Sequence, residues 1–231
     1  MKKIIFSTSL VMIFAMVFTF TVSFAKDFSD MSASHWAYKY VEELTNKGIV
    51  NGYEDGTFKP EGNVTKAEFM KLMMVAEYGE EVFTKVKNDM GTWYEPYFYI
   101  ADKAGFLTYD VNRITATEAI TRKEMAEILS MLAIKHGLIK NETPKKGNEE
   151  VVLEEGDVDE YAPGGKKSND YKMFNDLDNL TDLEKQYVEN TANAGLIKGY
   201  EDKTFRPSNN MTRAEVSTIV YRFLELTKEG K

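Results

Sequence analysis

Three stretches of the chain carry apolar residues at the three- and four-residue spacing of a helix that buries one face. Each stretch follows a Thr-x-x-Glu sequence, beginning at Thr65, Thr121 and Thr212. In this capping box the threonine hydroxyl accepts an amide of the first helical turn, and the glutamate accepts the amide of the threonine. The pattern predicts three equivalent amphipathic helices that pack on one another. Their apolar faces contain Phe69, Leu72, Met73 and Ala76; Met125, Ile128, Leu129 and Leu132; and Val216, Ile219, Val220 and Phe223.

A shorter helix is predicted ahead of each of these three. In the first case Trp36, Tyr40 and Leu44 share one face at positions i, i+4 and i+8, and Ser34 is the expected N-cap. Gly48 then supplies the left-handed residue that ends the helix. Equivalent glycines stand at Gly105 and Gly195.

These elements form an internal repeat. Residues 48–69 and 195–216 align without a gap and are identical at twelve of 22 positions. A degenerate middle copy keeps Asp89, Trp93, Gly105 and its capping box, and the glycine-to-threonine spacing is 17, 16 and 17 residues in the three copies. The repeat predicts an all-α fold, in which three helix-loop-helix repeats form a pseudo-threefold bundle with grooves between repeats.

The repeat also sets the expected domain boundaries. We expect repeats at 26–80, 81–140 and 173–231, the second with a degenerate loop. Residues 141–172 form an insert with nine acidic residues and five lysines, together with Pro144, Pro163 and the pair Gly164-Gly165. This composition is typical of a flexible acidic loop.

The first 25 residues have the pattern of a secretory signal peptide. Lys2 and Lys3 precede the apolar run from Leu10 to Phe18, and Ser23 and Ala25 place small residues before a cleavage site. The alternative is an uncleaved anchor, since 4–25 is just long enough to span a bilayer. Cleavage predicts a secreted protein without stable membrane insertion, whose net charge changes from −8 to −10 with the loss of two lysines.

Composition excludes several function classes. The absence of cysteine excludes disulfides, thiolate metal sites and cysteine nucleophiles, and His35 and His136 are too few for a multi-histidine metal site. The acidic charge argues against nucleic-acid binding. The segment 51–62 resembles a calcium loop only weakly, because Tyr53 and Gly62 stand where ligands are needed. The repeats leave no length for a catalytic domain, so neither an enzyme nor a cofactor or metal site is expected.

At the level of motifs the chain resembles the S-layer homology family. The motifs are Trp36-Ala37, the sequences at 48–52 and 53–60, and Thr-Arg-Ala-Glu at 212–215. The resemblance implies non-covalent attachment of exported bacterial proteins to secondary cell-wall polysaccharide, often pyruvylated, in grooves between repeats. In that family the arginine of Thr-Arg-Ala-Glu is associated with the acidic ligand. This role carries over to Arg122 and Arg213, with Lys66 as a departure in the first copy.

The position of these basic residues supports the same role. A cation at the first helical position opposes the helix dipole, yet all three copies have one, whereas Asp182 follows the expected cap Thr181. A cation beside free helix amides is a suitable seat for a carboxylate. The alternative is that an exposed first position tolerates any residue. Three weak grooves would give avidity on a repetitive polymer.

Other residues have two interpretations each. Trp36 and Trp93 either stack on sugar rings or anchor the core. Asp30, Asp89 and Asp176 either order the loops or contact sugar, and Gly48, Gly105 and Gly195 are loop-ordering or groove-lining. The expected partners are secondary cell-wall polysaccharide or peptidoglycan at the cell surface, with S-layer or other surface proteins as further candidates. The rival functions are a protein-binding module in a surface assembly and, less favoured, a wall-active glycoside hydrolase.

Overall fold

The structure, a computed structural model, describes residues 28–86, 91–106, 115–139 and 174–228. The predicted signal peptide at 1–25, the insert at 141–172 and Asp89 lie outside the described residues.

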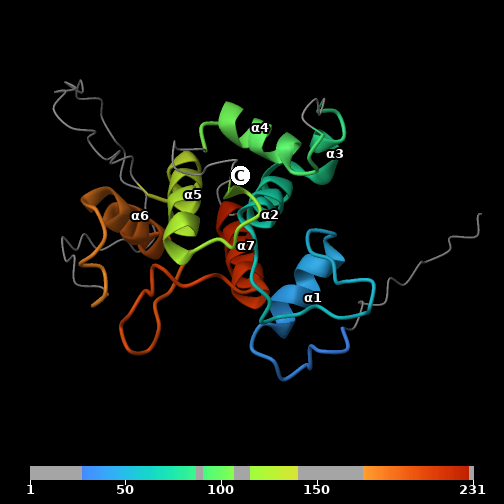
Figure 1. The fold of residues 1–231 in the computed structure, drawn as a ribbon, viewed down its shortest axis with the longest axis horizontal. Helices are drawn as coiled ribbons and strands as arrows, with labels where there is room; N and C mark the ends of the chain where they lie inside the picture. Colours follow the sequence, from blue (N-terminus) through green and yellow to red (C-terminus); the bar gives the residue numbers. More distant parts are fainter. Residues whose placement is uncertain (1–27, 87–90, 107–114, 140–173, 229–231) are drawn as a thin grey trace, which may run out of the picture.

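Seven helices make up the described part of the chain (Figure 1). The described ranges contain no strand, and three isolated β-bridges join residues near the helix starts. The all-α prediction is confirmed. In chain order the helices are α1 (Tyr38–Asn46), α2 (Lys66–Tyr78), α3 (Glu80–Phe83), α4 (Glu95–Lys103), α5 (Arg122–Lys135), α6 (Asp182–Asn193) and α7 (Arg213–Lys228).

Hydrogen bonds just ahead of α2, α5 and α7 close a ring. The Val64 amide donates to the Met211 carbonyl at 2.9 Å, the Met211 amide to the Ile120 carbonyl at 3.0 Å, and the Ile120 amide to the Val64 carbonyl at 2.9 Å. Each residue immediately precedes the threonine of a capping box, so the three helices start side by side. This cyclic pattern is the pseudo-threefold arrangement expected from the repeat.

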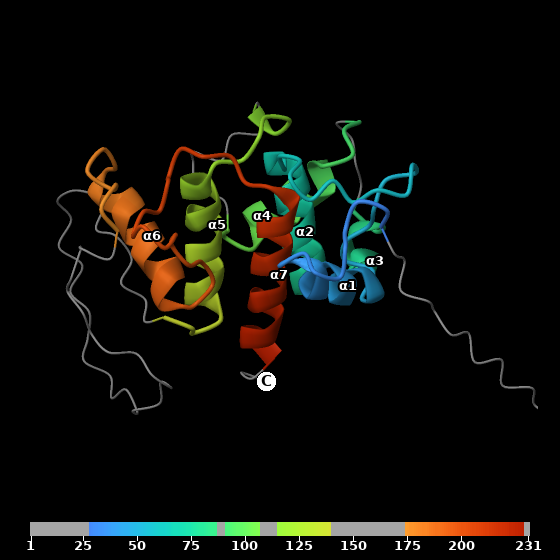
Figure 2. The same ribbon diagram turned by 90° about the horizontal axis from the view of Figure 1, so that it is seen from below.

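The outer helices α1, α4 and α6 each pack on the central helix of another repeat. Helix α1 packs on α7, α4 packs on α2, and α6 packs on α5. Figures 1 and 2 show each outer helix lying against a central helix that belongs to a different repeat. Each repeat therefore covers the apolar surface of its neighbour instead of its own.

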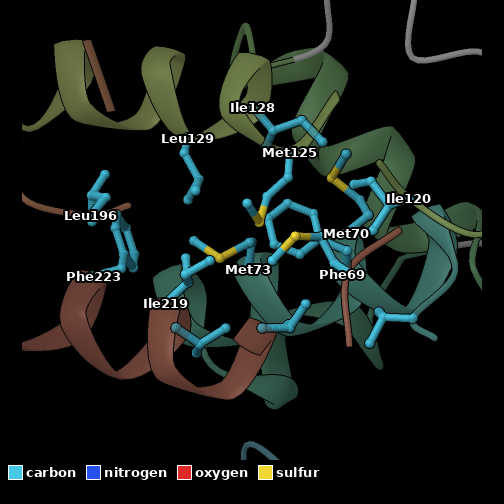
Figure 3. Packing of buried hydrophobic residues seen from close by; sticks show 14 of the residues in the cluster. Phe69, Met70, Met73, Ile120, Met125, Ile128, Leu129, Leu196, Ile219 and Phe223 are labelled. Carbon is cyan, nitrogen blue, oxygen red and sulfur yellow. The ribbon is translucent and has the colours of Figure 1, made fainter. Parts of the chain in front are cut away.

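The core lies between the three central helices (Figure 3). Phe69, Met73, Met125, Leu129 and Phe223 are all fully buried. Methionine is common here, and its flexible thioether fills the irregular space where three apolar faces meet. Of the twelve predicted face positions, only Leu72 and Ala76 are partly rather than fully buried.

The helix starts match the predicted boxes, with one exception. The boxes at Thr65, Thr121 and Thr212 are all formed. Ser34, however, does not cap α1, which begins at Tyr38 with Ala37 as its N-cap. The Ala37 amide donates to Nδ1 of His35 at 3.1 Å, and among the described residues no side chain caps the amides of the first turn of α1.

The glycines after the outer helices have the predicted backbone conformation. Gly48, Gly105 and Gly195 have φ of 70°, 76° and 74°, values at which any residue with a Cβ is strained. Within the described ranges, the helices fall short of the length and apolarity that a bilayer span needs.

Candidate functional site: three junctions between repeats

The first residue of each central helix projects into the loop of another repeat. Lys66 meets Thr115 and Glu118, Arg122 meets Lys198 and Phe205, and Arg213 meets Asn51 and Phe58. We call these contacts the Lys66, Arg122 and Arg213 junctions. The sequence therefore located the three basic residues at equivalent places, and the fold brings each to a boundary between repeats.

The helix amides at these junctions are already occupied. The Arg213 amide donates to the Gly62 carbonyl and the Ala214 amide to the Pro60 carbonyl, both at 2.9 Å. The amides of Arg122 and Lys66 are bound in the same way, to Asn209 and Glu118. The prediction that free amides at the helix starts bind an anion is therefore wrong, because carbonyls in the loop of the adjoining repeat already accept their hydrogen bonds. Only the side chains remain to recognise a ligand.

The Arg122 junction is buried. The Arg122 side chain is 4% exposed, and its Nε donates to the Phe205 carbonyl at 2.6 Å. Its Nη1 lies 3.5 Å from Oε1 of Glu215, and the Tyr200 hydroxyl donates to the same oxygen at 2.9 Å. Burial lowers the pKa of the Arg122 guanidinium, an effect that Tyr200 and Glu215 partly offset.

The Lys66 junction is also enclosed. The Lys66 ammonium lies 2.9 Å from Glu124, 3.6 Å from Glu118 and 2.9 Å from the Thr115 hydroxyl, and its side chain is 9% exposed. Burial alone would raise the pKa of Glu124, but hydrogen bonds from Thr121 and Lys66 outweigh it and hold that pKa below its ordinary value. The cation is therefore neutralised within the protein.

The Arg213 junction repeats the backbone contacts without the carboxylate. Nε of Arg213 donates to the Phe58 carbonyl at 2.7 Å, and Nη2 donates to the Asn51 carbonyl at 3.0 Å from a solvent-exposed position. Its guanidinium also lies over the Tyr53 ring, 4.8 Å from the centroid. Throughout the described ranges no carboxylate comes within ion-pair distance of Arg213.

Comparison with known families identifies two of these repeats. Residues 27–70 and 174–217 each match the S-layer homology domain. The two segments are S-layer homology domains. The match does not extend to the middle copy, so the prediction of three tandem S-layer homology repeats is confirmed at two segments, and the family assignment of 81–140 stays a prediction.

Several curated proteins share S-layer homology sequence with this chain. An exoglucanase of Acetivibrio thermocellus is 33% identical over 205 residues, covering 86% of this chain and 16% of the exoglucanase. An S-layer protein of Bacillus thuringiensis subsp. finitimus is 28% identical over 131 residues, which are 55% of this chain and 16% of that protein. A cellulosome-anchoring protein of Acetivibrio thermocellus is 28% identical over 111 residues, which are 45% of this chain and 25% of that protein.

Two aspartates order the loops of the S-layer homology segments. Asp30 accepts the amides of Phe58 and Lys59, both at 2.7 Å, and Asp176 accepts those of Phe205 and Arg206 at 2.8 and 2.7 Å. Burial acts to raise the pKa of Asp30, but the hydrogen bonds from the Phe58 and Lys59 amides outweigh it, so that pKa is lowered from its ordinary value. Lys59 and Arg206 have φ of 56° and 58°, so the aspartates stabilise a left-handed backbone at residues that resist it. These contacts give Asp30 and Asp176 a structural role in the loops. Contact of either aspartate with sugar stays a prediction.

The two tryptophans lie on the surface. Trp36 is 56% exposed and Trp93 is 53% exposed, so the interpretation as core anchors is wrong. Trp36 precedes α1 instead of lying on its face, because the helix begins two residues later. Its indole stacks on the His35 ring at 5.5 Å, and Trp93 lies edge-on to Tyr94 at 5.5 Å. Large exposed aromatic faces are therefore available beside the first and second repeats.

Sequence reasoning missed the role of the box glutamates. The sequence predicts Glu124 and Glu215 only as capping residues, and each does cap its helix through one carboxylate oxygen. The other carboxylate oxygen of each forms an ion pair with a cation of a neighbouring repeat, Lys66 for Glu124 and Arg122 for Glu215. A sequence signal existed, since every box has a basic residue two positions before its glutamate. Among the described residues no group of three or more metal-ligating side chains comes together.

Proposed function

We propose that this chain attaches non-covalently to the bacterial cell wall by binding secondary cell-wall polysaccharide at the junctions between its repeats. The observation that carries the proposal is the placement of a basic residue at the boundary between repeats in a chain with two S-layer homology domains. Carboxylate groups on the polymer, such as pyruvate ketals, are the chemistry that a guanidinium binds best.

The names of the relatives support attachment over catalysis. A cellulosome-anchoring protein and an S-layer protein share the matched sequence. The exoglucanase shares only 16% of its length with this chain, so its catalytic name does not transfer. We assign the chain an attachment role at the cell surface after export and no catalytic activity of its own.

The acidic charge of the chain does not oppose an acidic ligand. The net charge is −8, but exposed charges farther than about 8 Å from the ligand are largely screened at physiological ionic strength. The groups at the junction decide the local potential. At the Arg213 junction these include Arg213 and Lys59, which lie over the same Tyr53 ring, and Asp55, which pairs with Lys59 at 3.4 Å and leaves Arg213 as the charge in excess. Trp36 and Trp93, each more than half exposed, are proposed to stack on sugar rings.

Co-sedimentation with purified walls tests the proposal. Walls are used intact and after chemical extraction of the secondary polysaccharide, which leaves peptidoglycan. The expected result is binding to intact walls and loss of at least nine tenths of it after extraction. Binding that survives extraction would assign peptidoglycan as the ligand. Absence of binding to both would overturn wall attachment and make a protein partner in a surface assembly the leading function.

A further inference from the structure

The three junctions are equivalent in backbone geometry. The first residue of each central helix donates its amide to a carbonyl of the adjoining loop at 2.9 Å, the acceptors being Glu118, Asn209 and Gly62. The two arginines also share their guanidinium contacts, since each Nε donates to the carbonyl of a buried phenylalanine and each Nη2 donates to a second loop carbonyl. The junctions therefore differ in their burial and in the charged side chains around the cation, and these two features decide which of them binds a ligand.

The Lys66 junction has an excess of negative charge. One ammonium lies between the carboxylates of Glu118 and Glu124, and the Thr115 hydroxyl takes a further contact. A ligand carboxylate arriving here would meet two carboxylates around a cation that is almost fully buried. Like charges in such proximity repel, so this junction is closed to an anion.

The Arg122 junction already holds a carboxylate. Oε1 of Glu215 occupies the Nη1 side of the guanidinium and is fixed there by the hydroxyl of Tyr200. A ligand carboxylate would have to displace this internal counter-ion from a buried position. The displaced glutamate would lose both contacts, so exchange is unfavourable.

The Arg213 junction lacks that counter-ion. Its box glutamate, Glu68, binds the amide and hydroxyl of Thr65 at 2.8 and 2.9 Å, and no ion pair joins it to Arg213 in the described ranges. Nη1 of Arg213, the atom equivalent to the one that faces Glu215 in the Arg122 junction, has no hydrogen-bond or ion-pair partner there. The fixed contacts of Arg213 are to neutral carbonyls, which orient the guanidinium and leave its charge uncompensated.

We infer that the chain binds its acidic ligand at one junction, that of Arg213, and that the box glutamates Glu124 and Glu215 act as internal counter-ions which close the other two. Lys66 and Arg122 are then clamps between repeats, and Glu215 sets the number of sites. This inference rests on the proposed function and deepens it. It replaces avidity among three grooves with a single site per chain.

Titration calorimetry on the purified chain tests the number of sites. The probe is an oligosaccharide released from pyruvylated secondary cell-wall polysaccharide, compared with the same oligosaccharide after mild acid has removed the pyruvate. The wild-type chain is expected to bind one equivalent of the pyruvylated probe. Arg213→Gln, which keeps amide donors but lacks the charge, is expected to bind at least about tenfold more weakly.

Glu215→Gln supplies the gain-of-function arm. Glutamine preserves the capping box, so the helix start is retained while the counter-ion is removed. We expect the stoichiometry to rise from one to two, whereas the matched variant Glu68→Gln stays at one. Circular dichroism and thermal unfolding verify that all variants are folded.

The outcomes separate the inference from the proposed function. Two or more sites in the wild type, a folded Arg213→Gln variant that binds within twofold of the wild type, or a single site in Glu215→Gln would each overturn the inference and leave wall attachment standing. Failure of the wild type to bind the pyruvylated probe while it still sediments with intact walls would overturn the acidic-ligand assignment and the inference with it. Failure in both assays would overturn the proposed function as well.

Discussion

Replacing Lys66 by methionine tests whether this residue is a clamp between repeats. Methionine matches the alkyl part of the lysine, so the change removes the ammonium without opening a large cavity. Three contacts disappear, those to Glu124 at 2.9 Å, to Glu118 at 3.6 Å and to Thr115 at 2.9 Å. Glu124 keeps its capping bonds to Thr121 and loses its cation.

The expected cost follows from these contacts. A hydrogen bond to a charged group contributes about 1.5–3 kcal/mol, and the relief of no longer burying an ammonium offsets part of it. The Glu118 contact is long and that carboxylate is mostly exposed, so it adds little. We therefore expect a loss of about 2 kcal/mol at pH 7, and a fall in Tm of about 4–8 °C for a chain of this size.

The loss has a defined pH dependence. The pKa of Glu124 is held below its ordinary value, so its stabilising contribution is complete above about pH 4.3 and is lost as the pH falls through the folded-state pKa. Without Lys66 that pKa moves up. The difference in stability between wild type and Lys66→Met should therefore be largest at pH 7 and shrink as the pH approaches 3.

Urea unfolding at a series of pH values measures both quantities. The matched control is Lys47→Met, which breaks an exposed pair with Glu43 at 3.1 Å and is expected to cost less than about 0.5 kcal/mol. A loss below about 0.5 kcal/mol at pH 7 for Lys66→Met, or an equal loss at pH 7 and pH 3, would refute the reasoning.

Three further changes probe the loops and the surface by urea unfolding. Asp30→Ala leaves the Phe58 and Lys59 amides without their acceptor and should cost about 1–3 kcal/mol; a neutral result would contradict the loop-ordering role. Gly48→Ala meets no atom within 4 Å, so its expected cost of about 1 kcal/mol is purely that of a left-handed backbone, and no loss at all would count against that conformation. Trp36→Ala should cost less than about 1 kcal/mol, since the indole is exposed, and a larger loss would restore the core-anchor interpretation.

Local features of the fold could be predicted from the sequence. The capping boxes at Thr65, Thr121 and Thr212 depend on two residues three positions apart, and the left-handed glycines depend on one residue each. The buried faces followed from helical spacing alone. In each case the physical cause lies within a few residues of its effect.

Features that depend on distant residues could not be predicted. Ser34 has the residue type of an N-cap, but α1 begins at Tyr38 without a side-chain cap, and only the path of the chain decides where the helix starts. The second oxygen of Glu215 binds Arg122 because two repeats are adjacent in the ring. The basic residue two positions before each box glutamate marks these charges in the sequence, but only the closed ring decides which glutamate meets which cation.

The ring itself explains why a sequence repeat is not a structural unit here. Helix α1 covers α7, α4 covers α2 and α6 covers α5, so the apolar face of each central helix is completed by another repeat. A repeat taken alone would keep its capping box and would lose both the helix that it covers and the helix that covers it. The basic residues acquire a defined environment only when the ring closes, since their partners belong to another repeat. The binding proposed at the Arg213 junction therefore requires both the first and the last repeat, which contain the two S-layer homology segments.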